Sequence, residues 1–207
     1  MSPILTNKNY RARSVFSADA LLREARRQKQ LGKVSVPLIC ILDPDGDIVR
    51  RLRHSGLAKP FNAWPCYHTS LDCFELAGAT VGIVGCAVGA SFAVLVAEEL
   101  FASGCELLIS VTSAGQIRDL GKPPYFVVID RALRDEGTSY HYAEPSEFAD
   151  AQPTLVALAK RSLSAANVKT YIGASWTTDA PFRETTDAIE WARERGAVAV
   201  TYCYPRT

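Results

Sequence analysis

Residues 81–111, VGIVGCAVGASFAVLVAEELFASGCELLISV, contain the pattern that decides the fold. A short apolar run at 81–84 is followed by glycines, by an apolar segment of helical length at 90–102, and by a second apolar run at 107–111. Short apolar runs bounded by turn residues are typical of buried strands. The stretch therefore predicts a strand, a helix and a strand, with the two strands parallel, buried on both faces and joined by a right-handed crossover.

The same alternation continues on both sides of this unit. Upstream, Ser17 and Gly32 bracket an amphipathic helix, and residues 36–42 form an apolar strand that ends in the turn-forming sequence DPDGD at 43–47. Downstream, strands are predicted at 125–129, 168–173 and 197–200, and helices at 153–165 and 185–195. Strands that alternate with helices in this way indicate the α/β class.

The length of 207 residues fits one domain. We therefore predict a single three-layer α/β domain with a mixed, mostly parallel central sheet. Residues 1–35 are expected to form an N-terminal extension with its helix, and residues 36–207 the main domain.

Composition and charge exclude several classes of protein. The chain is 48% hydrophobic and 22% charged, and its 23 Lys and Arg residues are balanced by 22 Asp and Glu residues. This balance predicts no nucleic-acid partner, and the basic residues at 23–29, interrupted by Glu24, are interpreted as a solvated helix face. The first residues lack the apolar core of a signal peptide, and no apolar stretch is long enough for a membrane helix, so we expect a cytoplasmic protein.

The six cysteines are scattered and include no C-x-x-C pair. The nearest grouping that resembles a metal site, Cys66, His68 and Cys73, matches no zinc spacing. Neither a disulfide framework nor a metal site is therefore expected.

Candidate functional residues were sought just after the predicted strands, because ligands bind at the carboxyl ends of strands in open α/β sheets. Four segments stand out there: 85–91 (GCAVGAS), 112–116 (TSAGQ), 135–142 (DEGTSYHY) and 176–184 (WTTDAPFRE).

The first two segments have the chemistry of anion sites. Glycines before a helix, as at 85–91, present backbone N–H groups to an anion, although small residues there also allow close packing of helix and strand. The spacing does not match a dinucleotide-binding or Walker sequence. In the second segment the hydroxyls of Thr112 and Ser113 lie beside Gly115, which suits an oxyanion.

The segment 176–184 suits a small planar ligand. Trp176 or Phe182 can stack on a ring, and the Arg183 guanidinium can donate paired hydrogen bonds to a carbonyl or a phosphate. Thr178 and Asp179 add polar groups. The alternative interpretation is a helix start, with Pro181 near the first turn and Glu184 favoured by the helix dipole.

General bases are few, since the chain has three histidines, His54, His68 and His141. His141, in the polar loop 135–142, is the first candidate, although a lone histidine in a loop is more often structural. Cys86 has no identifiable partner for a nucleophilic role and is interpreted as a buried thiol. No catalytic residue is therefore assigned.

In this order, the four segments resemble the nucleoside phosphorylase family, which includes uridine phosphorylases and hexameric purine nucleoside phosphorylases. The resemblance runs from about residue 39 to 200, and its most specific stretches are 82–104, 112–117, 135–142 and 177–184. It implies phosphorolytic cleavage of the N-glycosidic bond of a purine or pyrimidine nucleoside, with phosphate as co-substrate and no cofactor. It also implies a homo-oligomer, a dimer or a hexamer.

The resemblance assigns roles to individual residues. Ser113 is similar to the hydroxyl residue that holds phosphate, and Thr112 and Gly115 shape the same turn. Phe182 and Arg183 are similar to the base-recognition residues, in the same segment as Trp176, Thr178 and Asp179.

The chain departs from the family pattern at the expected phosphate arginines. Asp47, in the turn 42–47, stands near the position of one arginine, and Ser110 stands near the position of the other. Since a carboxylate repels phosphate, a nucleosidase that uses water is an alternative reading. The family's Glu-Met-Glu ribose-binding segment has no counterpart after Val200, so we also expect a C-terminally truncated chain that lacks the last strand and helix. A non-catalytic remnant that binds nucleosides is the third reading.

Overall fold

The computed structural model describes residues 2–201, which form two compact units. One unit comprises residues 11–113, and the other comprises residues 114–201 together with 2–10. Each unit contains a five-stranded mixed sheet and its own helices, which confirms the α/β class. The strands thus fall into two sheets rather than the one central sheet expected from the sequence. The reason is that β6 (Gly115–Gln116) pairs with β10 (Ala197–Thr201) instead of extending the first sheet.

In the first unit the sheet has the strand order β2-β3-β4-β1-β5. The strands are β1 (Ile39–Asp43), β2 (Lys59–Pro60), β3 (Asp72–Leu76), β4 (Ala79–Gly85) and β5 (Leu107–Ser110), and the helices are α1 (Ala18–Lys29), α2 (Asp47–His54) and α3 (Ala90–Ala102). Because β1 pairs in parallel with both β4 and β5, these two strands are parallel to each other, as the sequence predicted.

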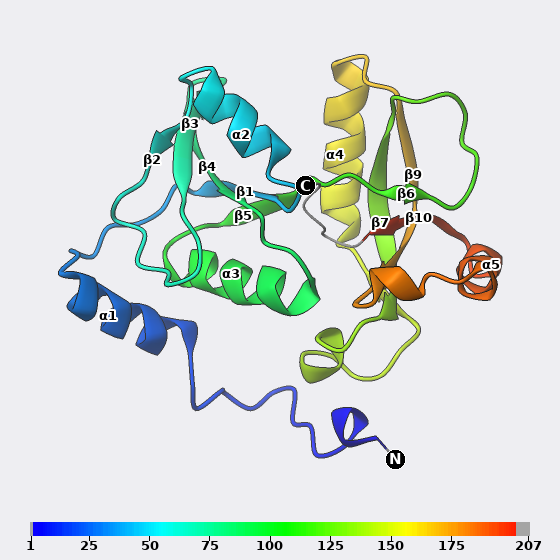
Figure 1. The fold of residues 1–207 in the computed structure, drawn as a ribbon, viewed down its shortest axis with the longest axis horizontal. Helices are drawn as coiled ribbons and strands as arrows, with labels where there is room; N and C mark the ends of the chain where they lie inside the picture. The colour runs from blue at the N-terminus through cyan, green and yellow to red at the C-terminus, as the bar shows by residue number, and fades with distance from the viewer. Residues whose placement is uncertain (1, 202–207) are drawn as a thin grey trace. The chain divides into compact units, whose positions relative to one another are not determined.

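Helices cover both faces of this sheet, as Figure 1 shows for α2 on one side and α3 with α1 on the other. On β1, Cys40 and Leu42 pack against Val96 and Leu100 of α3 in one buried cluster. On the opposite face, Val49 of α2 packs so closely on Gly85 that a Cβ there would lie 2.5 Å from the valine Cγ1. This unit is therefore a three-layer α/β structure.

Three elements of this unit, α2, β2 and β3, were not predicted. The helix α2 begins directly after the turn 43–46, with Gly46 as its N-cap residue in the left-handed region at φ 73°. The strands β3 and β4 form an antiparallel hairpin through Ala77 and Gly78, whose φ values of 50° and 81° are typical of a tight two-residue turn.

The N-terminal helix follows its predicted start but not its predicted end. The Ser17 side chain accepts a hydrogen bond from the Ala20 N–H at 3.3 Å and caps α1. The helix ends at Lys29 because Gln30, rather than Gly32, adopts the left-handed conformation. The predicted domain boundary at residue 36 stays a prediction.

In the second unit the sheet has the strand order β6-β10-β9-β7-β8. Besides β6 and β10 it contains β7 (Phe126–Asp135), β8 (Phe148–Asp150) and β9 (Thr170–Thr178), with helices α4 (Pro153–Ala165) and α5 (Thr186–Glu194) and short 3-10 turns η1 (Pro3–Leu5), η2 (Ser139–His141) and η3 (Pro181–Arg183). The helix α4 packs on β7 and β9, and α5 packs on β10 (Figure 1).

The core of the second unit is a buried apolar cluster that joins the sheet to α5. Leu133, Trp176 and Val200, from three different strands, pack there with Ala192 of α5. The strands β7 and β9 are longer than predicted and run in parallel as far as the pair Asp135 and Thr178. They therefore carry the segments 136–142 and 179–184 to one edge of the sheet.

Replacement of Leu133 by alanine tests this core. The side chain is fully buried, so we expect the free energy of unfolding to fall by about 2–5 kcal/mol from lost burial and the cavity left behind. Leu155→Ala on α4, where the side chain is 45% exposed, should change it by less than about 1 kcal/mol. Denaturant titration measures both, and equal effects would contradict the assigned core.

Candidate functional site

The carboxyl ends of three parallel strands in the first unit meet at one edge of the sheet. Asp43 of β1 pairs with Gly85 of β4, and Leu42 pairs with Ser110 of β5. The loops that follow these strands are consequently neighbours, and they contain the predicted anion-binding segments.

Asp43 organises the loop that follows β1. It is 1% exposed, its carboxylate accepts a hydrogen bond from the Val49 N–H at 2.9 Å, and its carbonyl accepts from the N–H groups of Gly46 and Cys86. Burial raises the pKa of the Asp43 carboxyl, against the opposing effect of its backbone hydrogen bonds. Asp43 therefore joins the start of α2 and the loop after β4 to the end of β1.

Asp45 belongs to the turn 42–47, and its carboxylate reaches the predicted phosphate turn at Thr112 and Ser113. One carboxylate oxygen accepts a hydrogen bond from the Ser113 N–H at 2.5 Å and lies 3.4 Å from the Thr112 hydroxyl oxygen. That hydroxyl is also 3.1 Å from the Ser113 carbonyl, so the two acceptors compete for its one proton. The chain's own carboxylate thus lies against Thr112 and Ser113.

Gly115, the third residue of the predicted phosphate turn, lies on β6. It pairs with Val200, and a Cβ at Gly115 would lie 2.7 Å from the Val200 Cγ1. Close packing of β6 against β10 therefore accounts for a glycine at this position.

Two of the three arginines of α2 are paired with carboxylates. Arg50 forms an ion pair with Asp47 and donates to the Asp45 carbonyl at 3.3 Å. Arg53 forms an ion pair with the buried Asp72 and also donates to the Ser70 hydroxyl at 3.0 Å. Both guanidinium groups are therefore engaged within their own unit.

A second candidate edge lies at the carboxyl ends of β7 and β9 in the other unit. The Asp179 carboxylate accepts a hydrogen bond from the Gly137 N–H at 2.8 Å and links the segments that follow these two strands. The Thr178 hydroxyl accepts from the Ala180 N–H at 3.2 Å. These two polar side chains are therefore used to hold the backbone of the segment.

The aromatic residues of the predicted base-binding segment have different environments. Trp176 is 2% exposed, packs in the core, and its indole N–H donates to the Asp135 carboxylate at 3.0 Å. Phe182 is 84% exposed and Arg183 is also exposed, both on η3. Phe182 and Arg183 therefore lie at the surface, whereas the indole ring is covered by protein.

Next to this pair, Glu184 has one carboxylate oxygen that is buried and has no hydrogen-bond partner among residues 2–201. Burial raises the pKa of this carboxyl, since the charged form loses solvation.

The loop 136–146 is held by a network that sequence reasoning missed. Arg134 is 6% exposed and donates to the Ser139 and Ser146 hydroxyls and to the Glu144 carbonyl, each at 2.7 Å. The Glu136 carboxylate accepts from the N–H groups of Thr138 and Ser139 at 2.6 and 2.9 Å. The sequence shows only that Arg134 and Glu136 are charged residues at the end of a strand. It does not show which loop groups they bond to.

His141 lies on η2, exposed, with its Nδ1 atom 2.8 Å from the Lys8 Nζ atom. A lysine ammonium can only donate, so Nδ1 accepts this hydrogen bond and the ring proton lies on Nε2. The Nδ1 atom of His141, the histidine chosen from the sequence, is therefore already hydrogen-bonded to Lys8.

The cysteines divide by exposure. Cys40, Cys66 and Cys105 are buried, and burial raises the pKa of each thiol, which disfavours the reactive thiolate. Cys86 is exposed, contrary to the expectation of a buried thiol, because its backbone turns at φ 62° directly after β4. Cys203 and the rest of the segment 202–207 lie outside the described residues.

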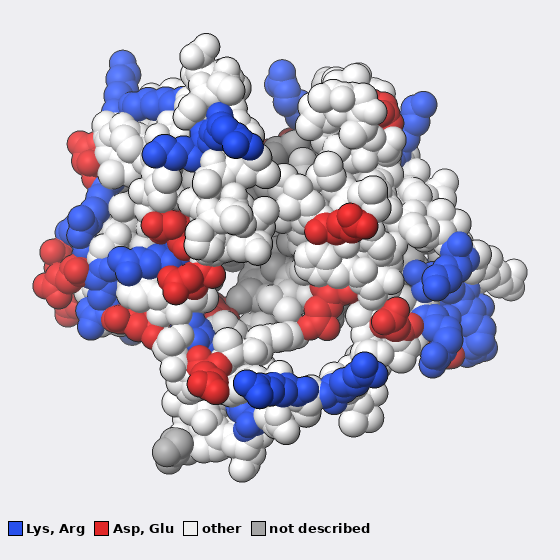
Figure 2. Space-filling model, turned by 180° about the vertical axis from the view of Figure 1, so that it is seen from behind, with Lys and Arg blue, Asp and Glu red and all other residues white. Residues whose placement is uncertain are grey.

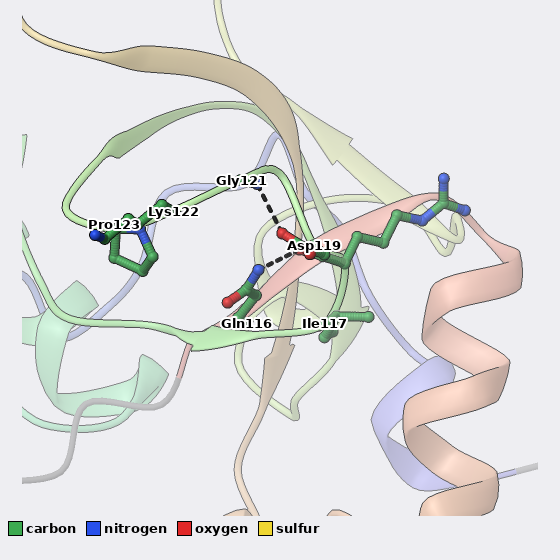
Figure 3. A pocket seen from close by; sticks show the side chains of 7 residues that line it. Gln116, Ile117, Asp119, Gly121, Lys122 and Pro123 are labelled. Carbon is green, nitrogen blue, oxygen red and sulfur yellow. Dashed lines mark hydrogen bonds between the residues drawn. The ribbon is translucent and has the colours of Figure 1, made fainter.

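A cavity of about 560 Å³ lies elsewhere on the second unit, along the segment 116–123 (Figure 3). Two hydrogen bonds shape it, from the Gln116 amide to the Arg118 carbonyl and from the Gly121 N–H to the Asp119 carboxylate. The segment leads into the start of β7, whereas the candidate residues follow its end. The cavity is therefore separate from the candidate edge.

Three observations limit the chemistry of the described residues. Among residues 2–201, no three His, Cys, Asp or Glu side chains form a group that could hold a metal ion. Within the same part of the chain, no helix is long and apolar enough to cross a membrane. Figure 2 shows basic and acidic side chains interspersed over the visible face, so local groups rather than one large field set the electrostatics there.

Comparison with known proteins identifies the family. Residues 38–200 match the phosphorylase superfamily, and the chain belongs to this superfamily. The comparison with curated protein sequences gave no significant match.

Solved structures with a similar fold include enzymes of two reaction types. Uridine phosphorylase from Vibrio fischeri is 22% identical with a TM-score of 0.70, over 84% of this chain and 74% of that one. A futalosine hydrolase mutant from Helicobacter pylori is 18% identical with a TM-score of 0.63, over 81% and 79%. The 5'-methylthioadenosine/S-adenosyl homocysteine nucleosidase of Helicobacter pylori is 17% identical with a TM-score of 0.63, over 81% and 75%. These likenesses establish the phosphorylase-like fold.

Removal of the Arg134 side chain tests the network of the loop 136–146. Arg134→Ala removes a buried guanidinium and its three charged hydrogen bonds to the loop, so we expect a loss of about 1.5–3 kcal/mol in the free energy of unfolding and faster proteolysis within 136–146. Arg161→Ala, an exposed position on α4, is the matched control and should change stability by less than about 0.5 kcal/mol. Unchanged proteolysis of Arg134→Ala would show that the network does not hold the loop.

The burial of Asp43 predicts a pH dependence. A carboxyl whose pKa is raised in the folded state contributes stability below its unfolded pKa and loses it as the pH rises through the folded pKa. Compared with Asp43→Asn, which keeps an acceptor for the Val49 N–H, the wild type should therefore lose stability as the pH rises from about 4 to 7. Denaturant titrations across this range measure the difference, and a constant difference would contradict the raised pKa.

Proposed function

We propose that this protein binds a nucleoside and cleaves its N-glycosidic bond. The observation that carries the proposal is the segment 178–184, which the Asp179 carboxylate fixes to Gly137 while Phe182 and Arg183 remain exposed. Membership of the phosphorylase superfamily supports the reaction class.

The exposed pair has the chemistry that recognises a nucleobase. A phenyl ring stacks on a planar heterocycle, and a guanidinium donates two directed hydrogen bonds to a carbonyl oxygen or ring nitrogen. Thr178 and Asp179 position this segment, and Trp176 supports it from the core by holding Asp135. We therefore place direct base contacts on Phe182 and Arg183.

The reaction breaks the bond between the sugar C1′ and the base nitrogen, and the electron pair leaves with the base, which takes up a proton. In phosphorolysis a phosphate oxygen forms the new bond to C1′ and gives a pentose 1-phosphate, whereas in hydrolysis a water oxygen does so and gives the free pentose. The sequence resemblance favours phosphate as co-substrate. The similar structures include a uridine phosphorylase and a nucleosidase, so both nucleophiles occur on this fold.

Arg183→Ala tests base recognition. Loss of a charged hydrogen bond to a base costs about 1–3 kcal/mol, so we expect nucleoside affinity to fall roughly 5- to 150-fold, measured by calorimetry with uridine, inosine and adenosine. The melting temperature should stay nearly unchanged, because Arg183 is exposed. Arg161→Ala, which removes an exposed arginine from α4, is the control and should bind nucleosides like the wild type.

Release of free base from the same nucleosides tests the activity itself. Release by the wild-type protein, with or without phosphate, supports cleavage of the N-glycosidic bond. If no nucleoside binds and no base is released under either condition, the proposed function is wrong and the interpretation as a non-catalytic remnant gains support.

A further inference from the structure

The turn formed by Thr112 and Ser113 already holds an anion that belongs to the chain itself. The Ser113 N–H donates to a carboxylate oxygen of Asp45 at 2.5 Å, and the Thr112 hydroxyl oxygen lies 3.4 Å from the same oxygen. A backbone N–H beside a hydroxyl is the donor set that would otherwise bind a free oxyanion. The Ser113 N–H is therefore occupied by a carboxylate that lies 68 residues away in the sequence.

We propose that Asp45 is a built-in occupant of this turn that excludes inorganic phosphate, so that water is the nucleophile of the reaction. The assignment of water rests on the proposed function, whereas the exclusion of phosphate rests on the turn alone. Asp45 is thereby a residue that determines specificity for the nucleophile.

The backbone around Asp45 keeps its carboxylate in place. The Gly46 N–H donates to the Asp43 carbonyl at 2.9 Å, and the Asp43 carboxylate holds the Val49 N–H at the start of α2. The Arg50 guanidinium donates to the carbonyl of Asp45 itself. A group fixed in this way competes with a free ligand as an intramolecular partner, at an effective concentration of millimolar or more.

Nearby charges disfavour phosphate as well. Asp43, Asp45 and Asp47 lie within five residues of one another, and a phosphate at the Ser113 N–H would be in contact distance of the Asp45 carboxylate. Two of the three α2 arginines, Arg50 and Arg53, are in ion pairs with Asp47 and Asp72. Repulsion between like charges at such short distance is strong even in a partly solvated site.

With water as the nucleophile, the reaction balances without any further reactant. A water oxygen forms the bond to C1′ as the bond from C1′ to the base nitrogen breaks. One water proton remains on the new sugar hydroxyl, and the other is the proton that the departing base gains. The products are a free pentose and a free base.

Phosphate binding to two variants tests the occupancy of the turn. Inorganic phosphate is titrated calorimetrically into the wild type, Asp45→Ala and Asp47→Ala, of which the last removes the same charge two residues away without a contact to Ser113. We expect Asp45→Ala to bind phosphate about 10- to 100-fold more tightly than the wild type, and Asp47→Ala to resemble the wild type. Equal gains in both variants would reduce the effect to net charge and overturn the proposal, as would wild-type binding as tight as that of Asp45→Ala.

If Asp45→Ala does not fold, Asp45→Ser replaces it, because the shorter side chain withdraws the carboxylate from the Ser113 N–H and still leaves a polar group in the turn. We then expect phosphate affinity above that of the wild type, and no change would overturn the proposal.

Base release by the wild type with and without phosphate separates this proposal from the proposed function. Equal rates support water as the nucleophile. Release that requires phosphate overturns the exclusion of phosphate and leaves N-glycosidic cleavage standing. An absence of release under both conditions, combined with phosphate binding gained by Asp45→Ala, supports the occupied turn and overturns the proposed function.

Discussion

The candidate edge of the first unit depends on two carboxylates that satisfy backbone N–H groups after parallel strands. Asp43 accepts from Val49 and thereby starts α2, and Asp45 accepts from Ser113 and thereby closes the turn after β5. Without these acceptors, the buried Val49 N–H would have no partner, and the exposed Ser113 N–H would bind water or an anion. The composition of one turn, Asp-Pro-Asp-Gly-Asp, thus determines what the neighbouring loops can bind.

In the second unit, too, carboxylates accept hydrogen bonds from backbone N–H groups of a loop that follows a strand. The carboxylates of Glu136 and Asp179 accept from N–H groups of the loop 137–139, and Arg134 holds the rest of that loop. The side chains of Phe182 and Arg183, which follow Asp179, are exposed. In both units the acidic residues therefore shape loops.

Sequence reasoning found the features that arise from local patterns. The apolar runs at 81–84 and 107–111 and the helix between them are present, and Ser17 caps its helix because the cap involves residues three positions apart. The helix α2 was missed because it is short and charged, and the hairpin of β3 and β4 because Ala77 is an unusual residue at positive φ.

The candidate site was harder to predict because its decisive contacts are long-range. The segments 112–116 and 176–184 were identified, but the Asp45 contact to Ser113 joins residues 68 positions apart, and no local pattern reveals it. Trp176 belongs to the predicted base-binding segment, yet β9 continues to Thr178 between β7 and β10, so the indole packs in the core on one face of the sheet. The sequence places Asp47 near an expected phosphate arginine. In the structure, however, the carboxylate that contacts the Thr112 and Ser113 turn is that of Asp45.

The identity of the sugar product is the measurement that tests the central claim most directly. The wild-type protein is incubated with a nucleoside and an excess of inorganic phosphate, and the phosphorus-containing products are followed by phosphorus-31 NMR as free base is released. An Asp45 carboxylate that occupies the Thr112 and Ser113 turn predicts free pentose, with the inorganic phosphate signal unchanged. Accumulation of a pentose 1-phosphate in step with the free base would contradict it.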